Sequence, residues 1–241
     1  MDENLTPEFR SDVVVELVRA NASDADVVFA ARVSTKGEAS RADIDADATT
    51  SAGLINFLMR DRHGTPFEHN SMTFYVQAPI FVFREFMRHR MASYNEESAR
   101  YRELQPVFYV PGPDRNLIQS GKPGAYDFLP GTTEQYAIVE EATKRACTVA
   151  YEEYREMLDA GVAREVARGV LPVSIYSSMY VTLNARSLMN FLSLRVKRLD
   201  SRFPSFPQRE IEMVAEKMEA IWAELMPITH ATFEKNGRVQ P

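Results

Sequence analysis

A basic cluster directly behind an apolar stretch is the feature that most limits how this chain can fold. Residues 84–102 read R-E-F-M-R-H-R-M-A-S-Y-N-E-E-S-A-R-Y-R and hold five arginines and one of only four histidines. Just before and within it, Ile80, Phe83 and Met87 recur on one face of a helix, so we expect that face to pack against the core. The spacing predicts that this helix ends in the R-H-R of residues 88–90 and that a polar loop follows. Because a helix end and a loop together offer backbone and side-chain donors to an anion, we interpret the cluster as the wall of an active site.

The alternative is that these arginines lie on a solvated surface. Arg84 and Arg88 are four residues apart and would share one face of the predicted helix, with Glu85 and Glu96 available to pair with them. Against this, phenylalanines at positions 81, 83 and 86 make the helix too apolar to lie freely in water. The forked arginine side chain suits phosphate or carboxylate, so we favour a ligand of that kind.

The overall charge narrows the possible partners. The chain has 241 residues and a formal net charge of -6, which argues against broad binding of nucleic acid or of a membrane surface. No apolar run is long enough to cross a bilayer, and the N-terminal residues lack the features of a signal peptide, so we expect a cytoplasmic protein. A chain of this length can bury one large core, and we expect residues 1–241 to form a single domain.

The pattern of apolar residues predicts an α+β fold, because strands and helices mix without strict βαβ alternation. We expect a mixed or antiparallel sheet packed by long helices. The expected strands lie near residues 13–18, 72–76, 107–110 and 175–183, and the expected helices near 23–33, 54–59, 80–90, 132–158, 163–170, 184–195 and 208–225. Gly64 is expected to cap the second helix. The polar segment 36–50 is predicted to be a mobile loop, and 111–131 a surface excursion.

Several common kinds of site are absent from the sequence. There is no G-x-G-x-x-G, no phosphate-binding P-loop and no H-E-x-x-H, so neither those nucleotide cradles nor that metal site is expected. His63, Glu68 and His69 could ligate a metal in principle, but a hydrogen-bonding histidine in a turn is the favoured interpretation, and we expect no metal. The single cysteine, Cys147, rules out a disulfide within one chain and is interpreted as a packed thiol rather than a nucleophile. Ser98 has no adjacent base in the sequence, so it is either a ligand-positioning hydroxyl or a turn residue.

The segment R-H-R-M-A-S-Y-N-E-E-S-A-R-Y, residues 88–101, resembles the R-H-R-x-x-S-x-N-E-x-S-x-R-Y signature of flavin-dependent thymidylate synthases, and every fixed position agrees. Three further segments resemble that family: T-P-F-E-H at 65–69, R-E-V-A-R-G-V-L-P at 164–172 and N-A-R-S-L-M-N-F-L-S-L-R at 184–195. Two positions depart from the family pattern. Ala99 stands where glycine is frequent, and no histidine follows Arg195 before His230.

The resemblance implies the thymidylate synthase-complementing fold and the conversion of dUMP to dTMP. In that family methylenetetrahydrofolate supplies the carbon, and NADPH supplies electrons through FAD, which is held between the subunits of a homotetramer with shared active sites. No cysteine nucleophile and no Rossmann loop would then be required. Two rival interpretations remain: a non-catalytic nucleotide-binding regulatory module that retains the dUMP pocket, and a different flavin oxidoreductase acting on a small anion.

The resemblance also implies roles for individual residues. The flavin contacts fall on Ser34, His63, Thr65, Glu68, Arg88, Arg90, Asn184, Arg186 and Asn190. The dUMP contacts fall on Glu85, Glu96, Glu97, Ser98, Ala99, Arg100, Arg168 and Arg195. We expect Arg100 and Arg168 to grip the phosphate, and Arg195, Ser98 and His63 to act in catalysis. Arg195 would face the pyrimidine carbonyl and stabilise the charge that develops there, and His63 would lie beside the isoalloxazine ring.

Overall fold

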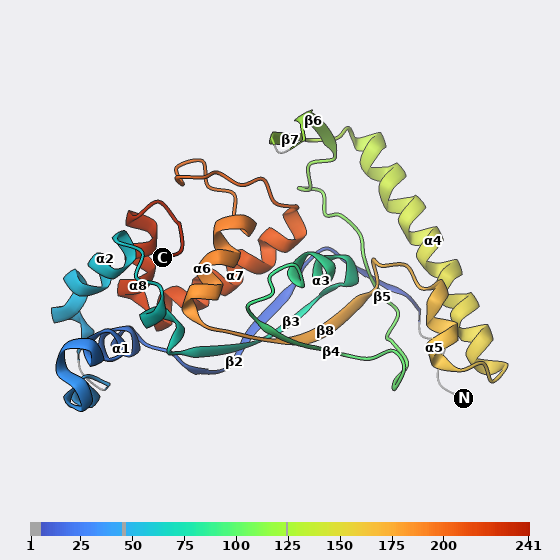
Figure 1. The fold of residues 1–241 in the computed structure, drawn as a ribbon. Helices are drawn as coiled ribbons and strands as arrows, with labels where there is room; N and C mark the ends of the chain where they lie inside the picture. The colour runs from blue at the N-terminus through green and yellow to red at the C-terminus, as the bar shows by residue number, and fades with distance from the viewer. Residues whose placement is uncertain (1–5, 45–46, 124) are drawn as a thin grey trace. The chain divides into compact units, whose positions relative to one another are not determined.

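A computed structural model describes residues 6–44, 47–123 and 125–241, and it confirms the α+β prediction (Figure 1). A four-stranded sheet has the order β2 (Val14–Asn21), β3 (Ser71–Pro79), β8 (Tyr176–Leu183) and β4 (Ser93–Glu96). Strand β1 (Glu8–Arg10) pairs in parallel with β5 (Val107–Tyr109), and β6 (Ile118–Lys122) pairs antiparallel with β7 (Ala125–Leu129). The α-helices are α1 (Asp24–Lys36), α2 (Ala52–Arg60), α3 (Ile80–Phe86), α4 (Thr133–Asp159), α5 (Arg164–Ala167), α6 (Ala185–Arg195), α7 (Arg209–Leu225) and α8 (Pro227–Lys235). Short 3₁₀ helices are η1 (Gly37–Asp43), η2 (Ala48–Ser51), η3 (Thr65–Glu68) and η4 (Arg168–Val170).

The chain forms two compact units, each assembled from separate stretches of sequence. Unit 1 contains the N-terminal residues up to Val14, together with Gln77–Phe86 and Asn95–Met179. Unit 2 contains Val15–Val76, Met87–Tyr94 and Tyr180–Pro241. That the whole chain acts as a single catalytic domain stays a prediction. Within the described ranges, no helix is both long and apolar enough to span a membrane.

Unit 1 is built on the long helix α4. Its first turn is closed by a capping box, in which the Thr132 hydroxyl accepts from the Gln135 N–H and the Gln135 side chain accepts from the Thr132 N–H. Farther along α4, Cys147 and Tyr151 are buried in an apolar cluster with Phe108, whose ring meets the Tyr151 ring edge-on at 6.2 Å. Burial raises the pKa of Cys147. The thiol therefore packs in the core, as predicted, and is not activated.

Unit 2 is held together by its C-terminal helices. Helix α7 contacts both α6 and α8, and Trp222 of α7 is fully buried with its ring 5.8 Å from that of Phe233. Helix α8 begins at Pro227, and its first N–H groups, those of Ile228 and Thr229, donate to the buried Asp24 carboxylate at 2.9 and 2.8 Å. This cap comes from a residue two hundred positions earlier, which is why local sequence patterns did not predict α8.

Three local predictions are wrong. Helix α3 ends at Phe86 rather than at residues 88–90, and Met87 is 42% exposed, so no core contact extends the helix. Helix α2 is capped by Asp61, not by Gly64. The predicted loop 36–50 contains η1 and the start of η2. The Asp43 carboxylate at the end of η1 pairs with both Arg32 and Lys36 of α1, and the Asp47 side chain caps η2 by accepting from the Thr49 N–H. The predicted surface excursion 111–131 is not contradicted: it contains the hairpin β6–β7, and every residue of β6 is exposed.

Candidate active site

Five of the residues predicted to contact dUMP meet at one pocket of unit 1, which has a volume of about 340 Å³. Glu96, Glu97, Ser98 and Ala99 come from the end of β4 and the turn behind it, and Arg168 comes from η4. The rest of the wall is mainly apolar and includes Ile80, Leu104, Leu171, Val173, Ile175 and the buried Ser177. An apolar wall with a few convergent polar groups is typical of small-molecule sites of this volume.

Hydrogen bonds within the turn shape the pocket wall at Ser98. The Ser98 carbonyl accepts from the N–H groups of Tyr101 and Arg102 at 3.0 and 3.2 Å. Its hydroxyl accepts from the N–H of Arg100 at 3.3 Å. The side chain therefore stabilises its own turn while it lines the pocket, which agrees with the interpretation of Ser98 as a positioning or turn residue.

The two neighbouring glutamates are held differently. The Glu97 carboxylate accepts from the Arg102 guanidinium at 3.0 Å and from the Ser178 hydroxyl at 3.2 Å. The half-buried Glu96 carboxyl accepts from Ser177, and its burial raises its pKa above the ordinary value despite that hydrogen bond. Burial disfavours the charged form of a carboxyl group. A charged Glu96, which serves as a hydrogen-bond acceptor in the pocket, therefore lowers the stability of the folded protein.

The two arginines predicted to bind the nucleotide phosphate, Arg100 and Arg168, differ in their position relative to the pocket. Arg168 is the first residue of η4 and lines the pocket. Arg100 is exposed, pairs with Glu165 at 3.0 Å and lies over the Tyr101 ring. Glu85 is half-buried on α3 and is not among the residues that line this pocket. The structure therefore puts one of the two arginines in the pocket wall.

The predicted flavin contacts all fall in unit 2, and the structure brings three of them to the start of α6 or the turn before β3. Arg186 of α6 pairs with Glu68 of η3, and its Nε–H donates to the Pro241 carbonyl at 2.8 Å. The guanidinium lies against the buried Gly64, where an added Cβ would come within 2.5 Å of the Arg186 Cζ. Asn184 caps α6 by accepting from the Ser187 N–H at 2.9 Å.

Each of the remaining residues predicted to contact the flavin lies in its own local surroundings. The exposed His63 lies against the Phe57 ring at 5.4 Å, and the Ser34 hydroxyl donates to the Ala31 carbonyl of its own helix. Thr65 begins η3 and is exposed, Arg88 and Arg90 are exposed in the segment after α3, and Asn190 is half-buried in α6. Among the described residues, His63, Glu68 and His69 do not form a group close enough to bind one metal ion.

Arg195 has a partner that sequence reasoning missed. Its Nε–H donates to Nε2 of His89 at 3.0 Å, across 106 positions of sequence. Burial and the neighbouring Arg195 charge lower the pKa of His89 to about 4, so the imidazole is neutral near pH 7. The only signal in the sequence was the place of this histidine between Arg88 and Arg90.

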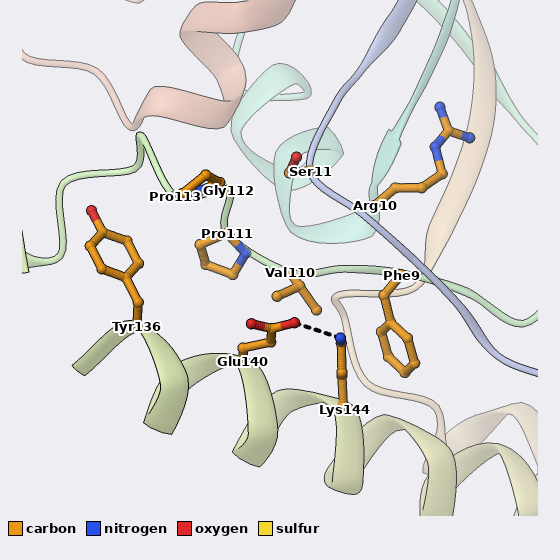
Figure 2. Close-up of a pocket in the computed structure, with 10 residues that line it drawn as sticks. All are labelled: Phe9, Arg10, Ser11, Val110, Pro111, Gly112, Pro113, Tyr136, Glu140 and Lys144. Carbon is orange, nitrogen blue, oxygen red and sulfur yellow. Dashed lines mark hydrogen bonds and ion pairs between the residues drawn. The ribbon is translucent and has the colours of Figure 1, made fainter. Parts of the chain in front are cut away.

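A second pocket of unit 1, of about 330 Å³, contains no residue that the sequence analysis assigned to a site. Figure 2 shows Glu140 and Lys144 of α4 at its edge, facing Phe9 and Pro111. Glu140 and Lys144 pair with each other, and the Lys144 ammonium lies 5.7 Å from the centre of the Phe9 ring. Because this ion pair neutralises both charges, we assign no ligand to the pocket.

Comparisons with known proteins decide the family. The model of the thymidylate synthase complementing protein family matches residues 16–228, which include both the basic cluster and the segments at 164–172 and 184–195. The chain belongs to this family. A relative from Streptomyces avermitilis, named flavin-dependent thymidylate synthase, is 63% identical over 240 residues, which cover 99% of this chain and 98% of the relative. One from Tropheryma whipplei with the same name is 59% identical over 98% of both chains.

A solved structure gives the same result for the fold. A UMP/dUMP methylase named PolB from Streptomyces cacaoi, bound with 5-Br dUMP, is similar with a TM-score of 0.91 and 58% identity, over 97% of this chain and 100% of that chain. The same protein bound with 5-Br UMP is similar with a TM-score of 0.90. These likenesses bear out the predicted family and fold.

The residues of unit 2 suit the flavin that this family's name implies. Arg88, Arg90 and Arg186 offer guanidinium groups, which bind phosphate oxygens with charge-assisted hydrogen bonds. Gly64 provides the close approach to Arg186 that a larger residue would block. Exposed guanidinium groups of this kind suit the phosphate of a flavin nucleotide, and the Arg186 group is also engaged by Glu68 and the Pro241 carbonyl.

Proposed function

We propose that this chain is a flavin-dependent thymidylate synthase that converts dUMP to dTMP. Overall, dUMP, methylenetetrahydrofolate, NADPH and a proton would yield dTMP, tetrahydrofolate and NADP⁺. The single observation that carries the proposal is the pocket at the end of β4, in which the second half of the family signature and Arg168 form the wall. Bound FAD would supply the hydride transfer between NADPH and the nucleotide.

The residues assigned to dUMP and to the flavin have distinct tasks in this proposal, and two of them, Arg195 and His63, belong to unit 2 and do not line the pocket. Arg168 pairs with the nucleotide phosphate, while Glu96 and the Ser98 turn exchange hydrogen bonds with the nucleotide. Arg195 faces the pyrimidine carbonyl and stabilises negative charge that builds up on that oxygen during reduction of the ring. His63, exposed beside Phe57, lies against the isoalloxazine face.

The proposal extends to assembly. We infer a homotetramer whose active sites are shared between subunits, which is consistent with the many exposed side chains among the predicted flavin contacts. A cytoplasmic location, and the absence of nucleic-acid and membrane partners, stay predictions.

Spectroscopy and a product assay test the proposed function together. Purified protein should be yellow, its flavin absorbance should bleach with NADPH, and dUMP with methylenetetrahydrofolate should then give dTMP. A regulatory module would bind dUMP without oxidising NADPH. Flavin oxidation by a small anion without dUMP or folate would indicate the other oxidoreductase.

UMP is a second candidate acceptor, because the solved relative is described as a UMP/dUMP methylase and was seen with analogues of both nucleotides. Competition between UMP and dUMP in one assay, with both methylated products quantified, measures the preference. Product from dUMP alone would restrict the activity to the deoxynucleotide.

A further inference from the structure

His89 is fixed at both its ring and its backbone. The ring meets the Phe191 ring edge-on, with centroids 4.9 Å apart and an interplanar angle of 79°. The His89 carbonyl accepts from the Tyr94 hydroxyl at 2.6 Å. Phe191 precedes Arg195 by one turn of α6, so a single helix presents both the surface that holds the imidazole and the guanidinium that it contacts.

The hydrogen bond between these side chains defines the protonation of the imidazole. A guanidinium has five N–H donors and no acceptor, so the Arg195 Nε–H must donate and His89 Nε2 must offer a lone pair. Nε2 therefore carries no proton, and the neutral ring holds its proton on Nδ1. The low pKa of His89, about 4, agrees with this geometry.

We propose that His89 is a positioning residue for Arg195, which holds the plane of the guanidinium by accepting its Nε–H. The inference rests on the proposed function, in which Arg195 faces the pyrimidine. An arginine side chain loses considerable rotamer freedom when it is ordered, and a fixed acceptor at Nε reduces the freedom that remains to be lost in the transition state. The terminal amino groups, which carry the other four N–H bonds, then keep a defined direction.

A histidine suits this task better than a carboxylate. A neutral imidazole orients the guanidinium without adding negative charge beside it, so it does not weaken the attraction between Arg195 and an oxygen that becomes negative. The titratable and charged groups against or beside His89 include Arg195 from α6, the Tyr94 hydroxyl from β4, and Arg88 and Arg90 on its own segment. Protonation of His89 would both remove the acceptor and place a second positive charge against Arg195.

Two amide substitutions of His89 provide a matched test. The His89→Gln side chain can place its oxygen near the position of Nε2, whereas the shorter His89→Asn side chain reaches only the position of Nδ1. We expect His89→Gln to keep kcat for dTMP formation within about threefold of wild type, and His89→Asn to lose about 10- to 100-fold with flavin content unchanged. Equal kcat in the two variants, or losses in flavin content that account for the losses in kcat, would overturn the proposal.

A spectroscopic measurement keeps the test independent of turnover and of the folding of the His89 variants. In wild-type holoenzyme with nitrogen-15 in its histidine rings, His89 should be neutral at pH 6 with its proton on Nδ1. Arg195→Met should raise the pKa of His89 and abolish the preference for that tautomer. A charged His89 at pH 6, or an unchanged spectrum in Arg195→Met, would refute the pairing. If wild-type protein made no dTMP while the spectra met the expectation, the proposed function would fail and the pairing would stand.

Discussion

Arg168 and Arg195 carry the same charge but lie in different surroundings. Arg168 is exposed at the edge of its pocket, whereas Arg195 is half-buried at the last residue of α6, where the helix dipole favours a positive charge. A group that binds an unreactive phosphate contributes equally to the ground state and the transition state. A group that meets a developing charge contributes mainly to the transition state.

Substitution of each arginine should therefore affect different kinetic constants. We expect Arg168→Ala to raise KM for dUMP about 10- to 100-fold with kcat nearly unchanged. Arg195→Ala should lower kcat by about 100-fold or more and retain most of the bound flavin. Steady-state kinetics with flavin quantification checks both. Equal loss of turnover and flavin in Arg195→Ala would contradict its assigned role.

Glu96 illustrates a residue kept for function at a cost to stability. Its pKa is raised in the folded protein, so between the unfolded and folded pKa values the native state binds more protons. Stability then falls as pH rises through that window, and the charged form at neutral pH is destabilising. We expect Glu96→Gln to raise Tm at pH 7 by a few degrees, at about 2–4 °C per kcal/mol.

The same substitution should change the pH dependence of nucleotide binding. In the wild-type protein, the affinity for dUMP should weaken as acidification protonates Glu96. Because the pKa of Glu96 is raised, this weakening should begin at a higher pH than for an ordinary glutamate. Glu96→Gln should bind dUMP more weakly at pH 7 and lack this component of the acid limb. Titrations of KM against pH in both proteins make the comparison, and identical acid limbs would show that Glu96 does not contact the nucleotide.

At the scale of elements, η3 and the start of α6 depend on the absence of a side chain at Gly64. Gly64→Ala would force the guanidinium of Arg186 to move, because the new Cβ would lie within 2.5 Å of its Cζ. We expect flavin affinity to fall about tenfold, measured by flavin titration of the apoprotein.

Gly53→Ala is the matched control, because Gly53 is in α2 with nothing within 4 Å of an added Cβ. It should gain about 0.5–1 kcal/mol of stability and keep its flavin affinity. Equal flavin affinity in the two variants would contradict the role of Gly64.

Sequence patterns predicted the elements that local signals determine. Helices α4 and α6 lie close to the predicted ranges 132–158 and 184–195, and each is capped by the side chain just before its first residue, Thr132 and Asn184. Elements that depend on distant partners were missed or misjudged. The segment after α3 leaves the helix and places His89 against Arg195, a contact that no local period encodes. In the same way, Asp43 of η1 pairs with Arg32 and Lys36 of α1, in a stretch whose composition predicted a loop.

In the molecule as a whole, the sequence identified five of the eleven residues that line the pocket, but not the serines that hold its glutamates. The family resemblance assigned Glu96 to Ala99 and Arg168 to one ligand, and these residues line one pocket; that the ligand is dUMP stays a prediction. It did not identify Ser177 and Ser178 of β8, which lie outside the family signature. Their hydroxyl groups hydrogen-bond to the carboxyl groups of Glu96 and Glu97. Serines in a strand have no distinctive pattern, so only the three-dimensional structure could find them.

Shared active sites make a prediction about mixtures. Each of the variants Arg168→Ala and Arg195→Ala should form dTMP more slowly than wild type when expressed alone. For Arg168→Ala this defect should be measured at subsaturating dUMP. If one site takes residues from different subunits, hybrid oligomers formed by coexpression should contain some intact sites and recover part of the activity. Activity of the coexpressed sample equal to that of the separately expressed variants, with hybrids verified by distinguishable tags, would contradict sharing.

As a flavin-dependent thymidylate synthase, this chain would transfer a one-carbon unit to dUMP with reducing equivalents held on a flavin. A single-turnover experiment tests this transfer most directly: NADPH-reduced holoenzyme, freed of excess reductant, is mixed anaerobically with dUMP and methylenetetrahydrofolate. We expect about one dTMP formed per flavin reoxidised, and no reoxidation when dUMP is omitted. Flavin reoxidation without dTMP, or dTMP formed without any change in the flavin, would contradict it.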